Sequence, residues 1–164
     1  MKAFFITCLL VLVISLTINA QEVKQLSTTV QIDSLIKANS GKTLMINLWA
    51  TWCEPCVEEF PDLIKLYKDY RDKNFVLVFI SLDQPGDLKT KVIPFLKDNG
   101  VDFTTYINGF KKQEDMINSI DRNWDGAIPA TYIFDNTGVI TASLIGGKTY
   151  NEFLNEVKKD LPND

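Results

Sequence analysis

Cys53 and Cys56 are the residues of this 164-residue sequence best suited to covalent chemistry. They stand two residues apart in "NLWATWCEPC", positions 47 to 56, behind an apolar run that contains a tryptophan. Two thiols at this spacing can act as a redox-active dithiol, supply half of a zinc site or close a structural disulfide. The residues around the pair and the composition of the chain bear on which of the three applies.

The sequence gives little support to a zinc site or to a purely structural disulfide. A structural zinc site needs four ligands, usually two cysteine pairs or one pair with histidines. The sequence has no histidine and no second cysteine pair, so we expect no metal site. A disulfide across two intervening residues closes a very small loop, and such a loop stabilises a fold least in the chain-entropy account. A redox-active dithiol is therefore favoured.

The N-terminal segment predicts export from the cytoplasm. Lys2 precedes a nearly unbroken apolar stretch from position 3 to 18, and the small residue Ala20 stands just before Gln21, which is the layout of a secretory signal. The stretch is short for a membrane span, although an uncleaved anchor is the alternative. We expect residues 1–20 to be a signal peptide or anchor, and Cys8 to leave with a cleaved signal.

Composition limits the partners of the remaining domain, residues 21–164. With 46% hydrophobic residues and no repeat or linker, it should form one globular unit with its own core. Loss of Lys2 leaves 16 basic against 21 acidic residues, a net charge near −5. Nucleic acid is an improbable partner, because its binding depends on basic charge. In an exported protein, Cys53 and Cys56 can pair only with each other or with a cysteine of a partner.

Hydrophobic patterning predicts a mixed sheet with helices on both faces. A hairpin is expected around the turn signal Asp135-Asn136-Thr137-Gly138. The predicted strands are buried ones at 43 to 50 and 75 to 83 and a short edge strand at 103 to 109. Helices are predicted at 31 to 39 and 54 to 72, after a turn at 84 to 87 up to residue 98, at 111 to 121 and at 150 to 161.

The predicted helix 54 to 72 gives the two cysteines different environments. Cys53 stands at the helix start, where unpaired backbone N–H groups and the positive end of the dipole favour a thiolate. Cys56 lies one turn inside, shielded and ready to attack a mixed disulfide formed by Cys53. Pro55 suits the first turn because its missing N–H costs nothing there. Centring the apolar face on Phe60 predicts that it also contains Cys56, Val57, Leu63, Ile64 and Tyr67, with Glu59 at its boundary and Glu58 in solvent.

"WATWCEPC" followed by "EEFP", and later "AIPATYIFDNTG", resemble the thioredoxin superfamily and, within it, the TlpA/ResA-like extracytoplasmic thiol:disulfide oxidoreductases. The resemblance covers roughly residues 22 to 161. It implies an α/β thioredoxin fold, a central mixed β-sheet flanked by helices, with an extra strand–helix insertion before a cis-proline. That proline is Pro129: the resemblance implies a cis Ile128-Pro129 peptide beside the dithiol, with the backbone at Ile128 binding the partner chain.

The same resemblance separates this sequence from thioredoxin and from peroxiredoxins. Thioredoxin has a buried aspartate six residues before its first cysteine, where this chain has Asn47, which cannot act as a base. Peroxiredoxins usually have a threonine where this chain has Ala50. TlpA/ResA-like proteins have a functional glutamate three residues after the second cysteine. Glu59 is therefore a candidate for proton transfer to and from the Cys56 thiol. The alternative is a half-solvated surface glutamate.

The other predicted site residues surround Cys53. Trp49 and Trp52 are expected to be packing residues first, and Trp52 also to form an apolar docking patch with Ile128 and Pro129. Glu54 and Pro55 separate the cysteines and should tune their redox potential. A carboxylate beside a thiolate repels it, so Glu54 should favour the disulfide slightly.

These residues predict an enzyme that works outside the cytoplasm, in the periplasm, and reduces disulfides of extracytoplasmic proteins by means of a Cys53–Cys56 dithiol. No cofactor besides this disulfide is expected. Apocytochrome c is one candidate substrate, a membrane thiol transducer is the expected electron donor, and the protein should act as a monomer, either soluble or tethered by its N-terminal segment. The alternatives are a periplasmic disulfide oxidase, a thioredoxin-like binding module without turnover and, more weakly, a peroxide reductase.

Overall fold

A computed structural model of the chain describes residues 22–161. The predicted signal or anchor, its cleavage point and Cys8 lie outside these residues. Within them, no helix is long and apolar enough to cross a membrane.

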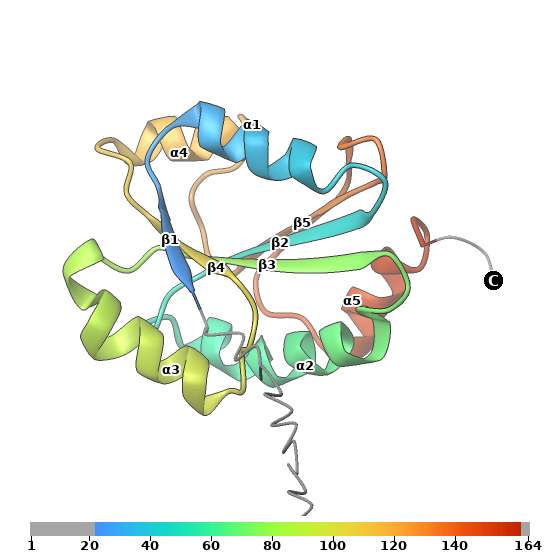
Figure 1. The fold of residues 1–164 in the computed structure, drawn as a ribbon, viewed down its shortest axis with the longest axis horizontal. Helices are drawn as coiled ribbons and strands as arrows, with labels where there is room; N and C mark the ends of the chain where they lie inside the picture. The colour runs from blue at the N-terminus through green and yellow to red at the C-terminus, as the bar shows by residue number, and fades with distance from the viewer. Residues whose placement is uncertain (1–21, 162–164) are drawn as a thin grey trace, which may run out of the picture.

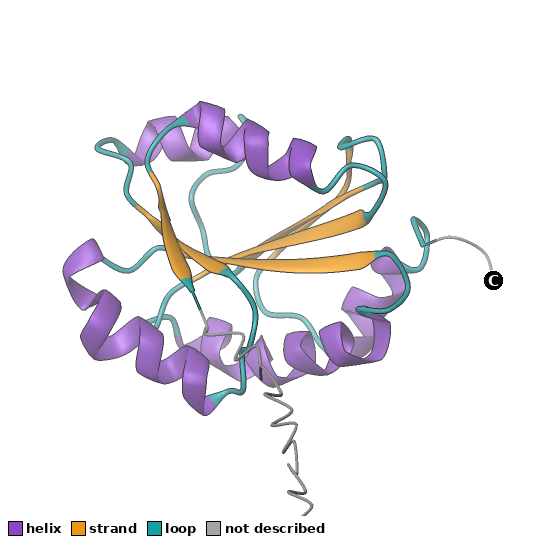
Figure 2. Ribbon diagram, in the orientation of Figure 1, coloured by secondary structure: helices purple, strands orange, loops and turns teal. Residues whose placement is uncertain are grey.

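The described residues form one six-stranded mixed sheet in the order β1-β4-β3-β2-β5-β6 (Figure 2). The four strands β1, β4, β3 and β2 are parallel, whereas β5 runs antiparallel to β2 and forms a hairpin with β6. The strands are β1 (Val23–Leu26), β2 (Thr43–Trp49), β3 (Phe75–Ser81), β4 (Thr105–Asn108), β5 (Ala130–Phe134) and β6 (Ile140–Ile145). The predicted thioredoxin fold, an α/β sheet with flanking helices, is confirmed.

Helices cover both faces of the sheet, with α1 and α4 on one face and α2, α3 and α5 on the other (Figure 1). The helices are α1 (Thr29–Ala38), α2 (Glu54–Tyr70), α3 (Ile93–Asp98), α4 (Gln113–Ile120) and α5 (Tyr150–Val157); a 3-10 turn η1 (Pro85–Asp87) and a π-helical turn η2 (Leu88–Val92) lead into α3. The sequence therefore predicted most helices and strands to within a few residues.

Alternation along the central strand β2 divides the interior into two cores. Met45 and Trp49 point to the α2 side, where they join residues of α2, α3 and α5 such as Phe60, Leu96 and Phe153. Ile46 and Leu48 point to the opposite side, where they join residues of α1 and α4 such as Ile32 and Met116. Continuous apolar runs in β2 and β3 thus reflect burial on both faces.

Aromatic contacts fix α2 over the central strands. Phe60 on α2 stacks on Phe79 of β3, with ring centroids 4.3 Å apart, and Trp49 at the end of β2 lies 4.9 Å from Phe60. Such pairs contribute about 0.5–1.5 kcal/mol each beyond the area they bury. The start of α2 is therefore anchored to the ends of β2 and β3, where the cysteines lie.

One prediction about the sheet was wrong, and one strand was not predicted. The strand expected at the edge, β4, is an interior strand, because β1 pairs with it in parallel from Val23↔Thr105 to Leu26↔Asn108. The sequence did not predict β1, a four-residue strand that forms the true edge.

Val57 was predicted to face the core but is 37% exposed, whereas the predicted boundary residue Glu59 is only 5% exposed. The buried arc of α2 is thus rotated away from Val57 and toward Glu59 and Leu66. Glu58 is exposed, as predicted.

Candidate redox site

The cysteine pair lies where β2 ends and α2 begins. A turn closed by a hydrogen bond from Cys53 N to Ala50 O (3.2 Å) joins the two elements, and Cys53 is the residue that precedes the first turn of α2. Cys53 and Cys56 form a disulfide with a Cα–Cα distance of 5.2 Å. Of the two pairings that the sequence left open, with each other or with a cysteine of a partner, the structure shows the first.

The two sulfur-bearing residues differ in burial. Cys53 is 6% exposed and Cys56 is fully buried in the core that contains Phe60 and Trp49. Cys53 occupies the N-cap position, so its sulfur belongs to the end of α2 where backbone N–H groups have no helical partner. Glu54 and Pro55 form the first turn, as the sequence predicted.

A cis-proline segment precedes β5. The Ile128-Pro129 peptide is cis, as the resemblance implied, and Pro129 O accepts a hydrogen bond from Gly146 N at 2.8 Å. Ile128 packs against both cores, including the one that holds the cysteines.

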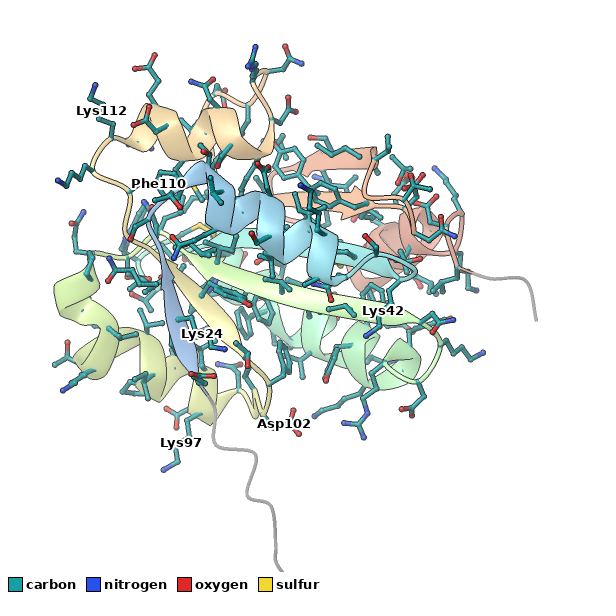
Figure 3. All side chains as sticks on the ribbon, turned by 45° about the horizontal axis from the view of Figure 1, so that its top comes forward. Lys24, Lys42, Lys97, Asp102, Phe110 and Lys112 are labelled. Carbon is teal, nitrogen blue, oxygen red and sulfur yellow. A yellow bond between two sulfur atoms is a disulfide. The ribbon has the colours of Figure 1, made fainter. Side chains whose placement is uncertain are left out.

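Trp49 and Trp52 have opposite surroundings. Trp49 is buried, which agrees with a packing role, but Trp52 is 66% exposed and does not pack inside the protein. Trp52 and Ile128 line one surface pocket of about 600 Å³, together with residues that follow β3 and β4. Phe110, which lies between β4 and α4 and is labelled in Figure 3, is among them. The structure thus brings Trp52 and Ile128 to one pocket, whereas Pro129, which was predicted to share this patch, is buried and does not line the pocket.

Glu59 is the buried acid of the site. It lies on α2 one turn beyond Cys56 and accepts two hydrogen bonds, from Asn47 Nδ2 to Oε1 (2.9 Å) and from Lys148 N to Oε2 (3.0 Å). Asn47 is itself fully buried on β2 and also donates to Thr131 Oγ1 of the neighbouring strand β5 (2.9 Å). Glu59 therefore connects α2 to the central strands and to the loop after β6.

Burial raises the pKa of the Glu59 carboxyl from 4.5 to about 7. The hydrogen bonds from Lys148 N and from Asn47, and the positive charge of Lys148, oppose this shift, because each stabilises the carboxylate. A carboxyl that titrates near neutral pH can both accept and release a proton under working conditions. Glu59 also lines a shallow cleft of about 290 Å³ with Pro55, Asp62 and Lys148, which leads from the carboxyl to solvent.

The sequence did not predict the partners of Glu59. Asn47 was noted only for the acid it replaces, and neither Thr131 nor Lys148 was identified. One signal was present: a polar amide in the middle of the apolar strand "TLMINLWA" must find a buried hydrogen-bonding partner. The contact with Lys148 is a backbone contact, so the identity of that residue carries no signal.

The described residues hold no cluster of three or more His, Cys, Asp or Glu side chains that could bind a metal ion. The buried carboxyl of Glu59 is instead hydrogen-bonded to Asn47 and to the backbone of Lys148.

A disulfide at the entrance of a helix, a cis-proline before the antiparallel hairpin and this strand order define a protein of the thioredoxin superfamily. A model of the AhpC/TSA family matches residues 16–143, and the chain belongs to that family.

Two curated relatives match most of the chain, and the name of the first states an activity. The thiol-disulfide oxidoreductase ResA of Bacillus anthracis is 28% identical over 127 residues, which cover 77% of this chain and 68% of the relative. The thioredoxin-like protein YneN of Bacillus subtilis (strain 168) is 31% identical over 130 residues, 78% of this chain and 69% of the relative. The chain is accordingly an enzyme of the thiol-disulfide oxidoreductase class, with the Cys53–Cys56 disulfide at its centre.

A solved structure supports the fold independently. The thiol:disulfide interchange protein of the thioredoxin family from Chlorobium tepidum TLS superposes with a TM-score of 0.64 at 24% identity, over 76% of this chain and 83% of that chain.

Proposed function

We propose that this enzyme reduces disulfides of proteins outside the cytoplasm, with Cys53 as the attacking thiol and Cys56 as the resolving thiol. The observation that carries this assignment is the difference in burial: Cys53 keeps 6% exposure at the N-terminus of α2, whereas Cys56 is fully buried one turn inside. We infer from this difference that a partner disulfide approaches the sulfur of Cys53 rather than that of Cys56.

The reaction balances as two thiol–disulfide exchanges. The Cys53 thiolate attacks one sulfur of the substrate disulfide, which forms a mixed disulfide and releases one substrate thiolate. The Cys56 thiolate then attacks the Cys53 sulfur, which closes the disulfide of the enzyme and releases the second substrate thiolate. Two electrons pass from the enzyme to the substrate, and the Cys53–Cys56 disulfide is the only redox group this scheme requires.

Glu59 accepts the proton that Cys56 must lose before it can attack. It is the buried carboxyl on α2 nearest in sequence to Cys56, and its pKa of about 7 suits proton exchange near neutral pH. The cleft beside Pro55 and Lys148 gives the carboxyl a route to solvent.

The surface around Cys53 binds the substrate polypeptide. Trp52, one residue before the attacking Cys53, offers an exposed aromatic ring, and Ile128, one residue before Pro129, lines the same pocket. Exposed tryptophans are strongly enriched among residues that dominate binding energy at protein interfaces.

The enzyme works as a monomer in the extracytoplasmic, periplasmic space, soluble or tethered by its N-terminal segment, and a membrane thiol transducer regenerates the dithiol. Apocytochrome c is a candidate substrate, because its haem-binding cysteines must be reduced before haem attachment. The net charge of about −5 expected after removal of the signal argues against nucleic acid as a partner.

The test is to trap substrates in cells. Cys56→Ser should accumulate mixed disulfides through Cys53, because the resolving thiol is absent, whereas Cys53→Ser should accumulate none. The reverse pattern would overturn the assignment of the two thiols. A variant without either cysteine should lose the cellular phenotype; if it keeps the phenotype, the protein acts as a binding module.

A further inference from the structure

We propose that Asp83 is a positioning residue of the redox site: its carboxylate holds the turn that places Cys53 at the N-terminus of α2. This inference rests on the proposed role of Cys53 as the attacking thiol. Asp83 follows β3 and belongs neither to the disulfide nor to the network of Glu59.

The Asp83 side chain is 1% exposed and is bound to the segment between β2 and α2. Its Oδ1 accepts a hydrogen bond from Thr51 Oγ1 (2.5 Å), and its Oδ2 accepts one from Thr51 N (3.0 Å). The backbone N–H and the hydroxyl of Thr51 thus both donate to the carboxylate of Asp83.

The carboxylate is in turn held by the end of β3. Ser81 Oγ donates to Asp83 Oδ2 (2.7 Å) and accepts from Asp83 N (3.0 Å). Leu82 N, between these two residues, donates to Trp49 O (2.7 Å), which continues the pairing of β3 with β2. Asp83 is therefore fixed to the rigid sheet, and Thr51 is fixed to Asp83.

Thr51 is the second residue of the turn that ends at Cys53. The turn is closed by the hydrogen bond from Cys53 N to Ala50 O, and its third residue, Trp52, points to solvent. Anchoring Thr51 sets the path of the next two residues, and so sets where the Cys53 sulfur lies relative to the free N–H groups of α2. Those groups stabilise the thiolate only when the sulfur lies close to them.

The chemistry of Asp83 suits this role better than a purely packing role. A buried carboxylate is costly to desolvate, and an apolar residue of similar volume often stabilises a fold as well or better. Three hydrogen bonds to its oxygens compensate for this cost, and two of them come from the residue that leads to the nucleophile.

The test measures the thiol pKa of Cys53 in the full chain carrying Cys56→Ser, from the pH dependence of iodoacetamide alkylation followed by mass spectrometry on the peptide that contains Cys53, so that alkylation of Cys8 is not counted. This readout does not depend on which thiol attacks substrates in cells, so its failure is distinguishable from failure of the proposed function.

Thr51→Val removes the hydroxyl donor at nearly constant shape and leaves Asp83, Glu54 and Glu59 in place. Thr51→Ser keeps the hydroxyl, and Asp98→Ala makes an equivalent truncation at an exposed position on α3.

We expect Thr51→Val and Asp83→Ala to raise the thiol pKa of Cys53 and to slow its alkylation at pH 7 by about threefold to tenfold, as for partial loss of a helix-terminus interaction. Thr51→Ser should restore the parent value, and Asp98→Ala should retain it. An unchanged pH profile in Thr51→Val, with only a lower unfolding midpoint, would overturn the proposal, since that is the outcome of a merely structural contact. A lower thiol pKa in Asp83→Ala would also overturn it, because the carboxylate would then act through its charge alone. Thr51→Val decides the question if Asp83→Ala does not fold.

Discussion

The side-chain amide of Asn47 donates a hydrogen bond to the carboxyl of Glu59 across the core, from β2 to α2, at 2.9 Å. The sequence placed an amide in the strand position where thioredoxin has its buried acid, and an acid on the helix instead. The two residues meet in the structure, so the acid of this site is displaced from the strand to the helix and remains buried beside the sheet.

Replacement of Glu59 by Gln should slow the resolution of mixed disulfides, because the Cys56 thiol loses its proton acceptor. The effect should be largest near and above pH 7, where much of the wild-type carboxyl is ionised, and the inflection near pH 7 in the rate should disappear. Stopped-flow measurement of disulfide exchange from pH 5 to 9 tests this. Glu58→Gln, an exposed neighbour, is the matched control. Equal disulfide-exchange rates for Glu59→Gln, Glu58→Gln and the parent would show that Glu59 has only a structural role.

The stability of the protein should also depend on Glu59 between pH 4.5 and 7. Since burial raises the folded-state pKa of this carboxyl from 4.5 to about 7, its protonation favours folding. That contribution is fully present below about pH 4.5 and is lost as the pH rises through about 7. By the linkage relation it amounts to on the order of 3 kcal/mol.

Urea unfolding at a series of pH values checks this dependence. Relative to Glu59→Gln, which cannot titrate, the parent should lose unfolding free energy from pH 4.5 to 7 and then level off. The offset between the two proteins should also contain about 1–3 kcal/mol from Lys148 N, which loses its acceptor if the amide nitrogen of Gln faces it. Parallel curves over this range would contradict the raised pKa.

Loss of the Asn47 side chain should move the titration of Glu59 to higher pH. Its hydrogen bond stabilises the carboxylate and lowers the pKa of Glu59, so Asn47→Ala removes an opposing effect and burial then dominates further. The pH profile of disulfide exchange should shift in the alkaline direction. Thr131→Val, which removes only the second contact of Asn47, should shift it less. An acid shift in Asn47→Ala would show that the amide does not support the ionised form.

Helix α2 illustrates how far the sequence predicts the site. Periodicity identified the helix and its apolar face, but the face was centred on Phe60. At 3.6 residues per turn, the centre of the buried face of α2 lies about 40° around the helix from Phe60. That rotation exposes Val57 and buries Glu59. It depends on where α2 rests against the sheet and α5, which are formed by segments far away in the sequence.

The missed strand β1 has a similar cause. Its four residues, "VKQL", are too few to show a clear strand pattern, and they pair in parallel with β4, about 80 positions later. Without β1, a short apolar segment such as β4 looks like an edge. The cis Ile128-Pro129 peptide, by contrast, was expected from the resemblance alone, since the residues by themselves indicate only a turn or a strand start.

Trp49 and Trp52 should separate stability from partner binding. Trp49 is buried among aromatic rings, so Trp49→Ala should cost about 3–5 kcal/mol of unfolding free energy. Trp52 is 66% exposed, so Trp52→Ala should change stability by no more than about 0.5 kcal/mol. In the Cys56→Ser background, however, Trp52→Ala should lower the yield of trapped mixed disulfides. Chemical unfolding and gel analysis of the trapped species measure the two effects. An undiminished yield would exclude Trp52 from the docking surface.

The direction of electron transfer should respond to Glu54, which separates Cys53 from Pro55 in the first turn of α2 and is exposed. Its carboxylate repels the Cys53 thiolate and so partly offsets the stabilisation of the thiolate by the helix dipole. This repulsion favours the disulfide and makes the dithiol the better electron donor. Glu54→His should therefore raise the reduction potential, and Glu54→Gln should raise it less.

The shift should be small. The potentials of thioredoxin, about −270 mV, and DsbA, about −120 mV, differ by roughly 150 mV, or on the order of 7 kcal/mol for two electrons. One solvent-screened carboxylate cannot account for that difference, because exposed charge pairs contribute only about 0–1 kcal/mol. We expect the parent protein to equilibrate with a dithiothreitol or glutathione buffer near the thioredoxin value. A potential above about −180 mV would instead favour the disulfide oxidase, since at that poise the disulfide form is the more readily reduced and would pass its bond on to substrates.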